Sequence, residues 1–283
     1  MFHRMGKLYV VATPIGNLND LSPRAQEILS HVTWIAAEDT RHSKGLLQHF
    51  GITTTLISYH EHNEQERASQ LIEGLLKGEE GALISDAGTP LISDPGYTLV
   101  KKALQANIPV IPIPGPCALI AALSVSGLPT DKFFFEGFLP AKKEMRRQRL
   151  KELIDFDHTM IFFEAPHRVN EMMEELVASW GPDREATLMR ELTKKFESVY
   201  FSTLQGILMS IQNGTIPLKG EFILVVKGSK RQLTQTESQQ EMERVLKILL
   251  AEMSLKQAVL IAEKLTSLPK NALYDCAISL QRL

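Results

Sequence analysis

Three clusters of acidic and basic side chains each follow an apolar segment of the chain. They are Glu38-Asp39-x-Arg41-His42, Glu164-Ala165-Pro166-His167-Arg168 and Arg190-Glu191-x-x-Lys194. Each cluster alone is a weak signal, because strand ends are normally polar. If the three converge on one pocket, they can supply proton transfer or charge stabilisation.

Two runs rich in glycine and proline predict where such a pocket lies. Residues 84–96 read ISDAGTPLISDPG, and residues 112–129 read PIPGPCALIAALSVSGLP. Parallel α/β sheets bind ligands at the carboxyl ends of their strands, where small residues and helix N-termini admit polar groups. We expect both runs to be loops at the ends of neighbouring strands, each leading into a helix. One run would only mark a loop, but two favour a binding cleft.

A third feature is a run of cations in residues 140–151. Six basic side chains accompany one acid, Glu144; the six are Lys142, Lys143, Arg146, Arg147, Arg149 and Lys151. A solvated helix face is the usual explanation of such a run. In a chain of net charge −2, a local phosphate-binding patch is about equally consistent with it.

Familiar cofactor and metal signatures are missing from the sequence. There is no G-x-G pair, no phosphate-binding G-x-x-x-x-G-K-[ST] and no H-E-x-x-H. His60-Glu61-His62 resembles a metal site, but neighbouring residues of a strand point to opposite faces, so we expect no metal there.

The elements that position these residues alternate along the first 115 residues. Apolar segments at 8–12, 33–37 and 54–58 predict strands, and Ser22-Pro23 predicts a capped helix start. Asn63-x-x-Glu66 predicts a capping box before an amphipathic helix. This alternation indicates a mostly parallel sheet with crossover helices.

Beyond Pro129 the pattern changes. Strand-like segments at 133–135, 159–163, 186–192, 199–201 and 221–226 are only partly separated by helical stretches at 144–154, 168–179 and 203–212, which predicts a second α/β domain with a mixed sheet. After a polar linker, residues 229–283 predict a helical tail, for which a plain three-helix cap is favoured over a helix-turn-helix. The expected domains are 1–116, 117–228 and 229–283.

Bulk properties fit an ordinary water-soluble protein. The 283 residues are 44% hydrophobic and 23% charged, and Cys117 and Cys276 form no C-x-x-C pair. No apolar stretch is long enough for a signal peptide or a membrane span, so we expect a cytoplasmic location and no membrane partner.

The motifs together resemble a known family over roughly residues 6–228. Besides the two loops, they are TPIGNLND, AEDTR, FFEAPHR, RELTKKFE and KGEF, all in the family's order. The chain resembles the tetrapyrrole-methylase-fold superfamily, whose members are class III methyltransferases, and within it the branch that methylates small-subunit ribosomal RNA. The first loop, 13–17, holds a single glycine, which suits the RNA branch better than a tetrapyrrole substrate.

The resemblance implies two α/β domains with a ligand cleft between them, plus the C-terminal helical appendage. It implies S-adenosyl-L-methionine as the methyl donor, a homodimer, and transfer to the ribose 2′-hydroxyl of a cytidine in the decoding region of 16S rRNA in the small ribosomal subunit. Donor contacts carried over by position are Pro14, Asp86, Ala87, Gly88, Cys117, Ala118, Phe163, Leu192, Gly220 and Glu221.

The ribose hydroxyl is a poor nucleophile at neutral pH, so a base should help to remove its proton. The candidates are Asp39, Glu164 and Glu191, and the sequence favours Asp39 or Glu191 because cations lie close to each. Lys142, Lys143, Arg146, Arg147 and Arg149 are the candidate RNA contacts. Two rival functions stay open: small-molecule methylation on the same fold, and non-catalytic RNA binding or ribosome assembly.

Overall fold

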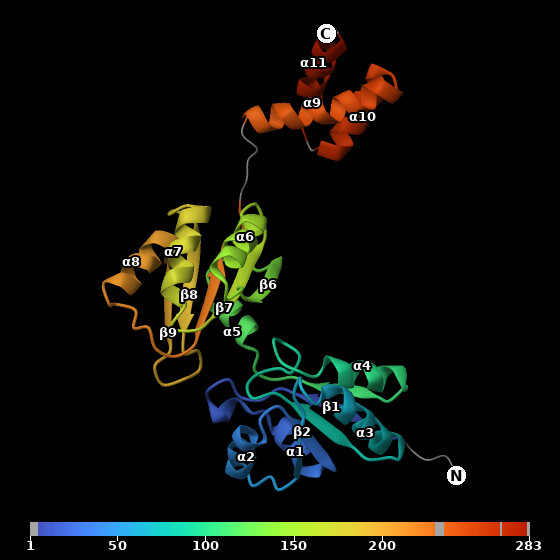
Figure 1. Cartoon of the computed structure of the whole chain (residues 1–283), viewed down its shortest axis with the longest axis vertical. Coiled ribbons are helices and arrows are strands. Elements are labelled where there is room, and N and C mark those ends of the chain that lie inside the picture. The colour runs from blue at the N-terminus through green and yellow to red at the C-terminus, as the bar shows by residue number, and fades with distance from the viewer. Residues whose placement is uncertain (1–4, 230–234, 267, 282–283) are drawn as a thin grey trace. The chain divides into compact units, whose positions relative to one another are not determined.

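The structure is a computed structural model that describes residues 5–229, 235–266 and 268–281 (Figure 1). The chain divides into two compact units, 1–229 and 230–283. The first unit contains two sheets, and the second contains helices alone. The boundary expected between residues 116 and 117 lies inside the first unit and stays a prediction.

The first sheet is entirely parallel, as the alternation of strands and helices predicts. Its strand order is β3-β2-β4-β1-β5. The strands are β1 (Leu8–Val11), β2 (Trp34–Ala37), β3 (Thr55–Ser58), β4 (Gly81–Ile84) and β5 (Val110–Ile113). The expectation that the two glycine- and proline-rich loops follow neighbouring strands is wrong, because β1 lies between β4 and β5.

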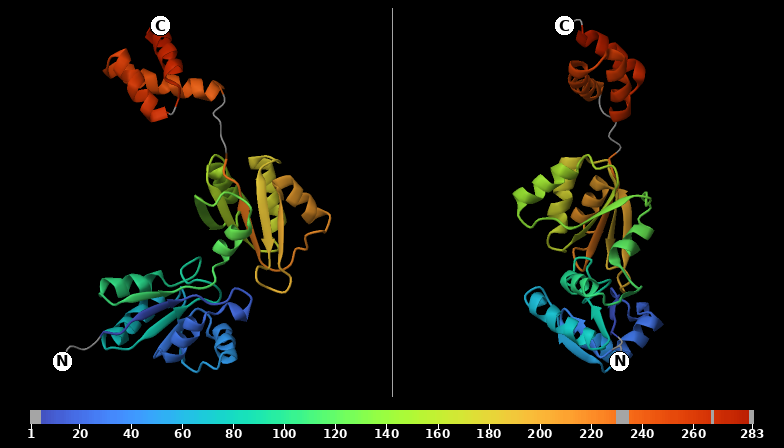
Figure 2. Two further views of the ribbon diagram at one scale, coloured as in Figure 1. Left: turned by 180° about the vertical axis from the view of Figure 1, so that it is seen from behind. Right: turned by 90° about the vertical axis from the view of Figure 1, so that its right-hand side faces the viewer.

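Helices cover both faces of this sheet (Figure 2). One face packs on α1 (Pro23–His31) and α2 (Thr40–His49), and the other on α3 (Glu64–Leu76) and α4 (Tyr97–Gln105). Successive strand residues serve opposite faces: Trp34 and Ala36 face α3 and α4, whereas Ile35 and Ala37 face α1 and α2. Burial on both sides explains why the three inner strands, β1, β2 and β4, are continuously apolar.

Helix starts were predicted with mixed success. Ser22 caps α1 by accepting a hydrogen bond from Ala25 N at 3.1 Å, with Pro23 at the first helical position, as predicted. Asn63 makes no cap hydrogen bond to α3, so the predicted capping box is wrong. Its side chain instead accepts from His60 N and donates to Ser58 O. These hydrogen bonds within the tight turn after β3 occupy the side-chain amide, so it is not free to cap the helix.

The second sheet is mixed, as predicted, with order β6-β7-β10-β8-β9. Only β6 and β7 are parallel to each other. The strands are β6 (Phe133–Phe138), β7 (Thr159–Glu164), β8 (Glu185–Arg190), β9 (Ser198–Thr203) and β10 (Phe222–Val226). The helices are α5 (Ala118–Val125), α6 (Lys143–Leu153), α7 (Val169–Trp180) and α8 (Leu204–Gln212). α6, α7 and α8 cover one face and α5 the other.

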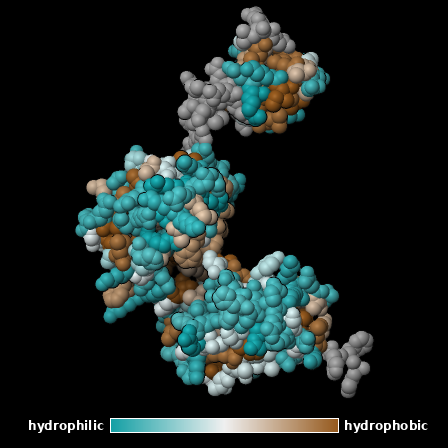
Figure 3. Space-filling model, in the orientation of Figure 1, coloured by the Kyte–Doolittle hydropathy of each residue, from teal (hydrophilic) through white to brown (hydrophobic). Residues whose placement is uncertain are grey.

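The helical unit consists of α9 (Gln235–Glu252), α10 (Leu255–Thr266) and α11 (Lys270–Gln281). Its small core includes Leu246, Val259 and Leu273. It exposes several large apolar side chains, among them Ile248 and Leu265 (Figure 3). The expected linker, residues 229–232, lies outside the described residues except for Ser229. Within the described part of the chain, every helix is too short or too polar to cross a membrane.

The cation run is not a uniformly solvated helix face. Arg146 of α6 is 2% exposed, and its Nε donates to Glu175 of α7 at 2.6 Å. That hydrogen bond raises the pKa of Arg146. Arg149 makes a bidentate pair with Glu136 at 2.7 and 2.8 Å. Arg146 is therefore corrected from an RNA contact to a buried ion-pair partner. Arg149 is paired but only half-buried, so its RNA contact stays a prediction, as do those of the exposed Lys142, Lys143 and Arg147.

We predict that Arg146→Ala lowers the free energy of unfolding by about 3–5 kcal/mol, because it leaves the Glu175 carboxylate buried without its charge partner. Arg147 bonds the same carboxylate at 3.3 Å but is 57% exposed, so Arg147→Ala should cost less than about 1 kcal/mol. Urea unfolding followed by circular dichroism measures both. Equal losses in the two variants would contradict a structural role specific to Arg146.

Candidate functional site

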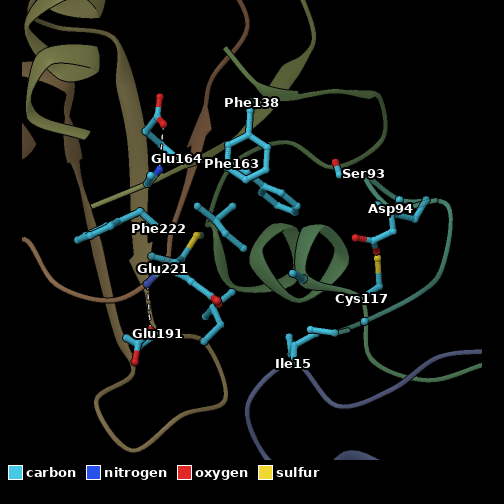
Figure 4. A pocket seen from close by; sticks show the side chains of 18 of the residues that line it. Ile15, Ser93, Asp94, Cys117, Phe138, Phe163, Glu164, Glu191, Glu221 and Phe222 are labelled. Carbon is cyan, nitrogen blue, oxygen red and sulfur yellow. Dashed lines mark hydrogen bonds between the residues drawn. The ribbon is translucent and has the colours of Figure 1, made fainter. Parts of the chain in front are cut away.

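A pocket of about 370 Å³ lies between the two sheets of the first unit. Its first wall comes from the loops that follow β1, β4 and β5, and its second from the ends of β7 and β8 and the start of β10. Figure 4 shows Ile15, Asp94 and Cys117 on one side, with Phe163 and Glu164 opposite. The volume falls within the roughly 300–1,000 Å³ of small-molecule sites.

The pocket brings together most of the residues predicted from the sequence. Those that line it are Ala87, Gly88, Cys117, Ala118, Phe163, Glu164, Glu191, Leu192 and Glu221. Pro14, Asp39, Asp86 and Gly220 are outside its lining. Residues that the sequence analysis did not select also line it, including Ile15, Ser93, Asp94, Phe138, Met189 and Ile223.

The residues outside the lining hold its walls. Pro14 is buried between Thr13 and Ile15 in the sequence. The backbone of Thr13 pairs with that of Gly88, and Thr13 N donates to Gly88 O at 2.9 Å. The Asp86 carboxylate accepts a hydrogen bond from Asp39 N at 3.0 Å. Asp86 thus fixes the connection after β2 rather than facing the pocket.

Asp39 is placed as a helix cap. Its Oδ1 accepts from Arg41 N at 2.8 Å at the start of α2, and its Oδ2 accepts from Arg41 Nη2 at 3.0 Å. The hydrogen bond from the Arg41 side chain lowers the pKa of Asp39 to about 2. Asp39 is therefore both outside the pocket and a weak base, contrary to the preference drawn from the sequence.

Glu191 lines the pocket but is already engaged. Its Oε1 accepts from Lys194 Nζ at 3.1 Å and from Glu221 N at 2.9 Å. Burial raises the pKa of Glu191, but these two donors outweigh it, and the pKa lies below its ordinary value. Gly220 has φ +86°, and a Cβ there would overlap the Glu191 carboxylate, so the glycine makes room for this arrangement.

Glu164 ends β7 and is 3% exposed. Its Oε1 accepts from Ala165 N at 2.9 Å and lies 3.1 Å from Arg168 Nε, although that contact is not aligned as a hydrogen bond. Among the described residues, no partner bonds its Oε2. Burial raises the pKa of Glu164, and the Ala165 N–H and Arg168 oppose the rise only in part. A buried carboxylate oxygen without a partner is an unsatisfied acceptor, which sets Glu164 apart from the fully bonded Glu191.

Asp94 is the carboxyl group on the first wall, where it lies near Ser93 and Cys117 (Figure 4). Burial raises its pKa to about 6, partly opposed by a hydrogen bond from Ser85 and assisted by the charge of Asp86. The signal was present in the sequence, because Asp94 is the second aspartate of the 84–96 loop. The donor contacts expected from this loop, Asp86, Ala87 and Gly88, all lie in its first half.

Both walls carry backbone strain. Leu91 and Ser93 have φ of 73° and 66°, and Glu191 and Thr193 have φ of 53° and 65°. Non-glycine residues seldom adopt this left-handed region of positive φ, and such backbone strain clusters at ligand sites. The two loops are therefore held in specific shapes beside the pocket.

The chemistry available is proton removal within an apolar enclosure. Phe163 lies edge-on to Phe135 at 4.9 Å and to Phe138 at 5.8 Å, so aromatic rings form part of the second wall. Two carboxyl groups with raised pKa, Asp94 and Glu164, stand on opposite walls. Within the described residues, no group of histidine, cysteine and carboxylate side chains has the arrangement of a metal site.

Comparisons with known proteins agree with this architecture. Residues 7–208 match the family model of tetrapyrrole (corrin/porphyrin) methylases, and residues 236–281 match a model described as the RsmI C-terminal HTH domain. The second match favours a helix-turn-helix over the plain three-helix cap preferred from the sequence.

Two relatives match almost end to end. A protein of Pseudomonas aeruginosa named ribosomal RNA small subunit methyltransferase I is 49% identical, over 98% of both chains. One of the same name from Escherichia coli O157:H7 is 47% identical, over 98% of this chain and 96% of that protein.

A solved structure shows the same fold at low identity. It is a uroporphyrin-III C-methyltransferase from Thermus thermophilus, complexed with S-adenosylhomocysteine. The TM-score is 0.52 with 16% identity, over 78% of this chain and 97% of that one.

Proposed function

The chain belongs to the tetrapyrrole methylase family and, within it, to the ribosomal RNA small subunit methyltransferase I proteins, and we propose that it methylates small-subunit ribosomal RNA with S-adenosylmethionine. The observation that carries the proposal is the 49% identity to such a protein over 98% of both chains. The alternative, methylation of a tetrapyrrole, has support only from proteins that share the fold at low identity.

The residues of the pocket fit this donor. S-adenosylmethionine combines an apolar-faced adenine with polar groups, and the pocket combines Phe138, Phe163 and Ile223 with carboxylates. Ala87 and Gly88 are small and permit close approach of their backbone to the donor. When bound, the donor supplies a methyl group activated by its sulfonium.

The chain then has two tasks. The first is to align the acceptor hydroxyl with that methyl group and to exclude water, for which the aromatic wall and strained loops are suited. The second is to take the proton of the hydroxyl.

The finer reaction is also part of the proposal. The acceptor is the ribose 2′-hydroxyl of a cytidine in 16S rRNA, and Lys142, Lys143 and Arg147 contact the RNA backbone from α6 and its start. The protein works in the cytoplasm, in keeping with its two free cysteines.

We predict that the full chain transfers labelled methyl groups from S-adenosylmethionine to 16S rRNA or small ribosomal subunits, and not to uroporphyrinogen. Ala87→Leu should weaken donor binding at least tenfold, because Ala87 lines the pocket and the added side chain occupies it. Ala178→Leu, on the exposed face of α7, is the matched control. Calorimetric titration measures donor affinity. Transfer to the tetrapyrrole but not to RNA would contradict the proposal.

We place the base at Glu164 rather than at Asp39 or Glu191. Asp39 lies outside the pocket lining, and the pKa values of Asp39 and Glu191 are lowered by cations and N–H donors. Glu164 combines a raised pKa with an unpaired oxygen. Catalytic bases work best when their pKa approaches the operating pH, and Asp94 is the rival by this criterion.

We predict that Glu164→Gln lowers the single-turnover rate by roughly 10²–10⁴-fold with donor affinity retained. The pKa of Glu164 is raised, so the wild-type rate should increase as pH rises through a value above 4.5, and this limb should disappear in the variant. Asp94→Asn and Glu191→Gln are the matched controls. Loss of rate and of the acidic limb in Asp94→Asn alone would move the base to Asp94.

We further propose a homodimer formed through one apolar surface. Edge strand β9 exposes Val199 and Phe201, and α5 exposes Val125. A Cβ at Gly127, just beyond α5, would lie 3.7 Å from the Phe201 ring, so the strand and the helix end adjoin. Exposed edge strands with large apolar side chains are usually covered by a partner.

Light scattering of the full chain should give twice the 31.7 kDa monomer mass. Phe201→Glu should reduce the mass to that of a monomer, because a carboxylate cannot be buried in an apolar contact. Phe133→Glu, on the opposite edge strand β6, should leave the dimer intact. A dimer that survives Phe201→Glu contradicts this interface.

A further inference from the structure

A second hollow, separate from the pocket, lies on the first sheet between α2 and the edge strand β3. Its volume is about 750 Å³. Its lining residues are Thr40, Arg41, Lys44, Leu47, Gln48, Ile52, Thr53, Thr54, Leu56 and Ser58. We call it the α2–β3 groove. It contains two cations, several hydroxyl and amide groups, and no carboxylate.

The two cations lie on one face of α2. Arg41 and Lys44 are three residues apart, which puts neighbouring side chains on the same side of a helix. The Arg41 side chain is 91% exposed, and Lys44 is exposed as well. Among the described residues, Lys44 has no ion-pair partner, so its charge is available to a ligand.

Asp39 orients Arg41 rather than withdrawing it. The carboxylate accepts from Arg41 Nε at 3.3 Å and from Arg41 Nη2 at 3.0 Å, which leaves Nη1 outside the pair. Because Arg41 stays highly exposed, the pair sets the direction of the guanidinium at the start of α2. A guanidinium held in this way is suited to phosphate oxygens.

The groove is joined to the pocket by a short chain of contacts. Asp39 N donates to Asp86 at 3.0 Å, and the next two residues, Ala87 and Gly88, line the pocket. α2 follows β2, and the 84–96 loop follows β4. Because β2 and β4 are paired neighbours, the start of the groove lies one strand away from that loop. Burial raises the pKa of Glu38, and the nearby charges of Asp86 and Asp94 add to the rise, so acidic side chains gather beside the start of α2.

From this arrangement we infer that the α2–β3 groove binds the phosphates of a single RNA strand beside the nucleotide whose ribose enters the pocket. The inference rests on the proposed RNA substrate and gives it a path along the first sheet. The acidic side chains beside the start of α2 repel phosphate, so the backbone is held at the groove while an uncharged ribose and base extend toward the pocket. The groove thereby sets which nucleotide reaches the methyl donor.

The composition of the groove favours RNA over a protein partner. Leu47 and Ile52 are 2% and 5% exposed, so of its three apolar lining residues only the half-buried Leu56 offers surface for side-chain docking. The exposed Thr53 and Gln48 can bond ribose hydroxyls and phosphates. Cations with hydroxyl and amide groups are the usual contacts to a nucleic-acid backbone.

The test uses the full chain and a single-stranded RNA oligonucleotide with the sequence of the 16S decoding region. The variants are Lys44→Gln and the double variant Arg41→Gln/Lys44→Gln. The control removes two cations near the amino ends of strands β1 and β4 of the same sheet, Lys7→Gln/Lys77→Gln. Fluorescence anisotropy gives Kd at several salt concentrations, calorimetry gives donor affinity, and steady-state methylation gives kcat and KM.

We expect the double variant to raise the RNA Kd on the order of tenfold and to reduce the salt slope by about 1.4, since a single strand contributes roughly 0.7 per phosphate contact. Lys44→Gln, which leaves the Asp39–Arg41 pair intact, should give about half that change in slope. KM should rise while kcat and donor affinity stay at wild-type values. The control should match wild type throughout.

A double variant with the RNA Kd and salt slope of wild type, in an enzyme that methylates the oligonucleotide, would overturn the groove and leave the proposed function standing. Weaker binding to assembled subunits with unchanged binding to the oligonucleotide would assign the groove to a ribosomal protein and also overturn the inference. A wild-type chain that binds donor but neither binds nor methylates RNA would overturn both.

Discussion

The site depends on the short connection between β5 and α5. The chain leaves the first sheet at Ile113, and α5 begins at Ala118 on the face of the second sheet. Leu119, Ala122 and Leu123 of this helix are buried against strands β7, β8 and β10. Four residues are too few to permit wide separation, so the apolar burial of α5 places the carboxyl edge of the first sheet opposite the strand ends of the second.

That placement also explains the electrostatics of the pocket. A carboxylate at a sheet edge is normally solvated, but Asp94 and Glu164 are buried, and burial raises the pKa of each. Glu191 lines the same pocket, and burial raises its pKa as well. Its pKa nevertheless lies below the ordinary value, because a backbone N–H and Lys194 stabilise the ionised form. Carboxyl groups of similar sequence context thus acquire different basicity from their surroundings alone.

Sequence patterns predicted the fold well because the spacing of apolar residues reflects which face of each helix or strand is buried. The helices at 144–154, 168–179 and 203–212 were placed within one residue of α6, α7 and α8. Side-chain partners were predicted poorly. Arg146 and Glu175 are 29 residues apart in the sequence, so their ion pair depends on tertiary packing that no spacing rule contains. The Asn63 side chain bonds within the turn after β3 instead of capping α3, which depends on a competition between local hydrogen bonds. The preference for Asp39 is a different case, since Arg41 was visible in the sequence, but a hydrogen bond from its side chain lowers the pKa of Asp39 and makes it a weaker base.

The layout also divides recognition of an RNA from the chemistry performed on it. The pocket holds Asp94, Glu164, Glu191 and Glu221, so phosphates entering it would meet four carboxyl groups. A net charge of −2 gives the chain no general attraction for RNA either. Under the proposed function, the RNA backbone is therefore bound by local cations outside the pocket, and a nucleotide extended from the strand reaches the methyl donor. The enclosure that raises the basicity of the carboxyls is thus the same feature that requires cationic surfaces elsewhere on the chain.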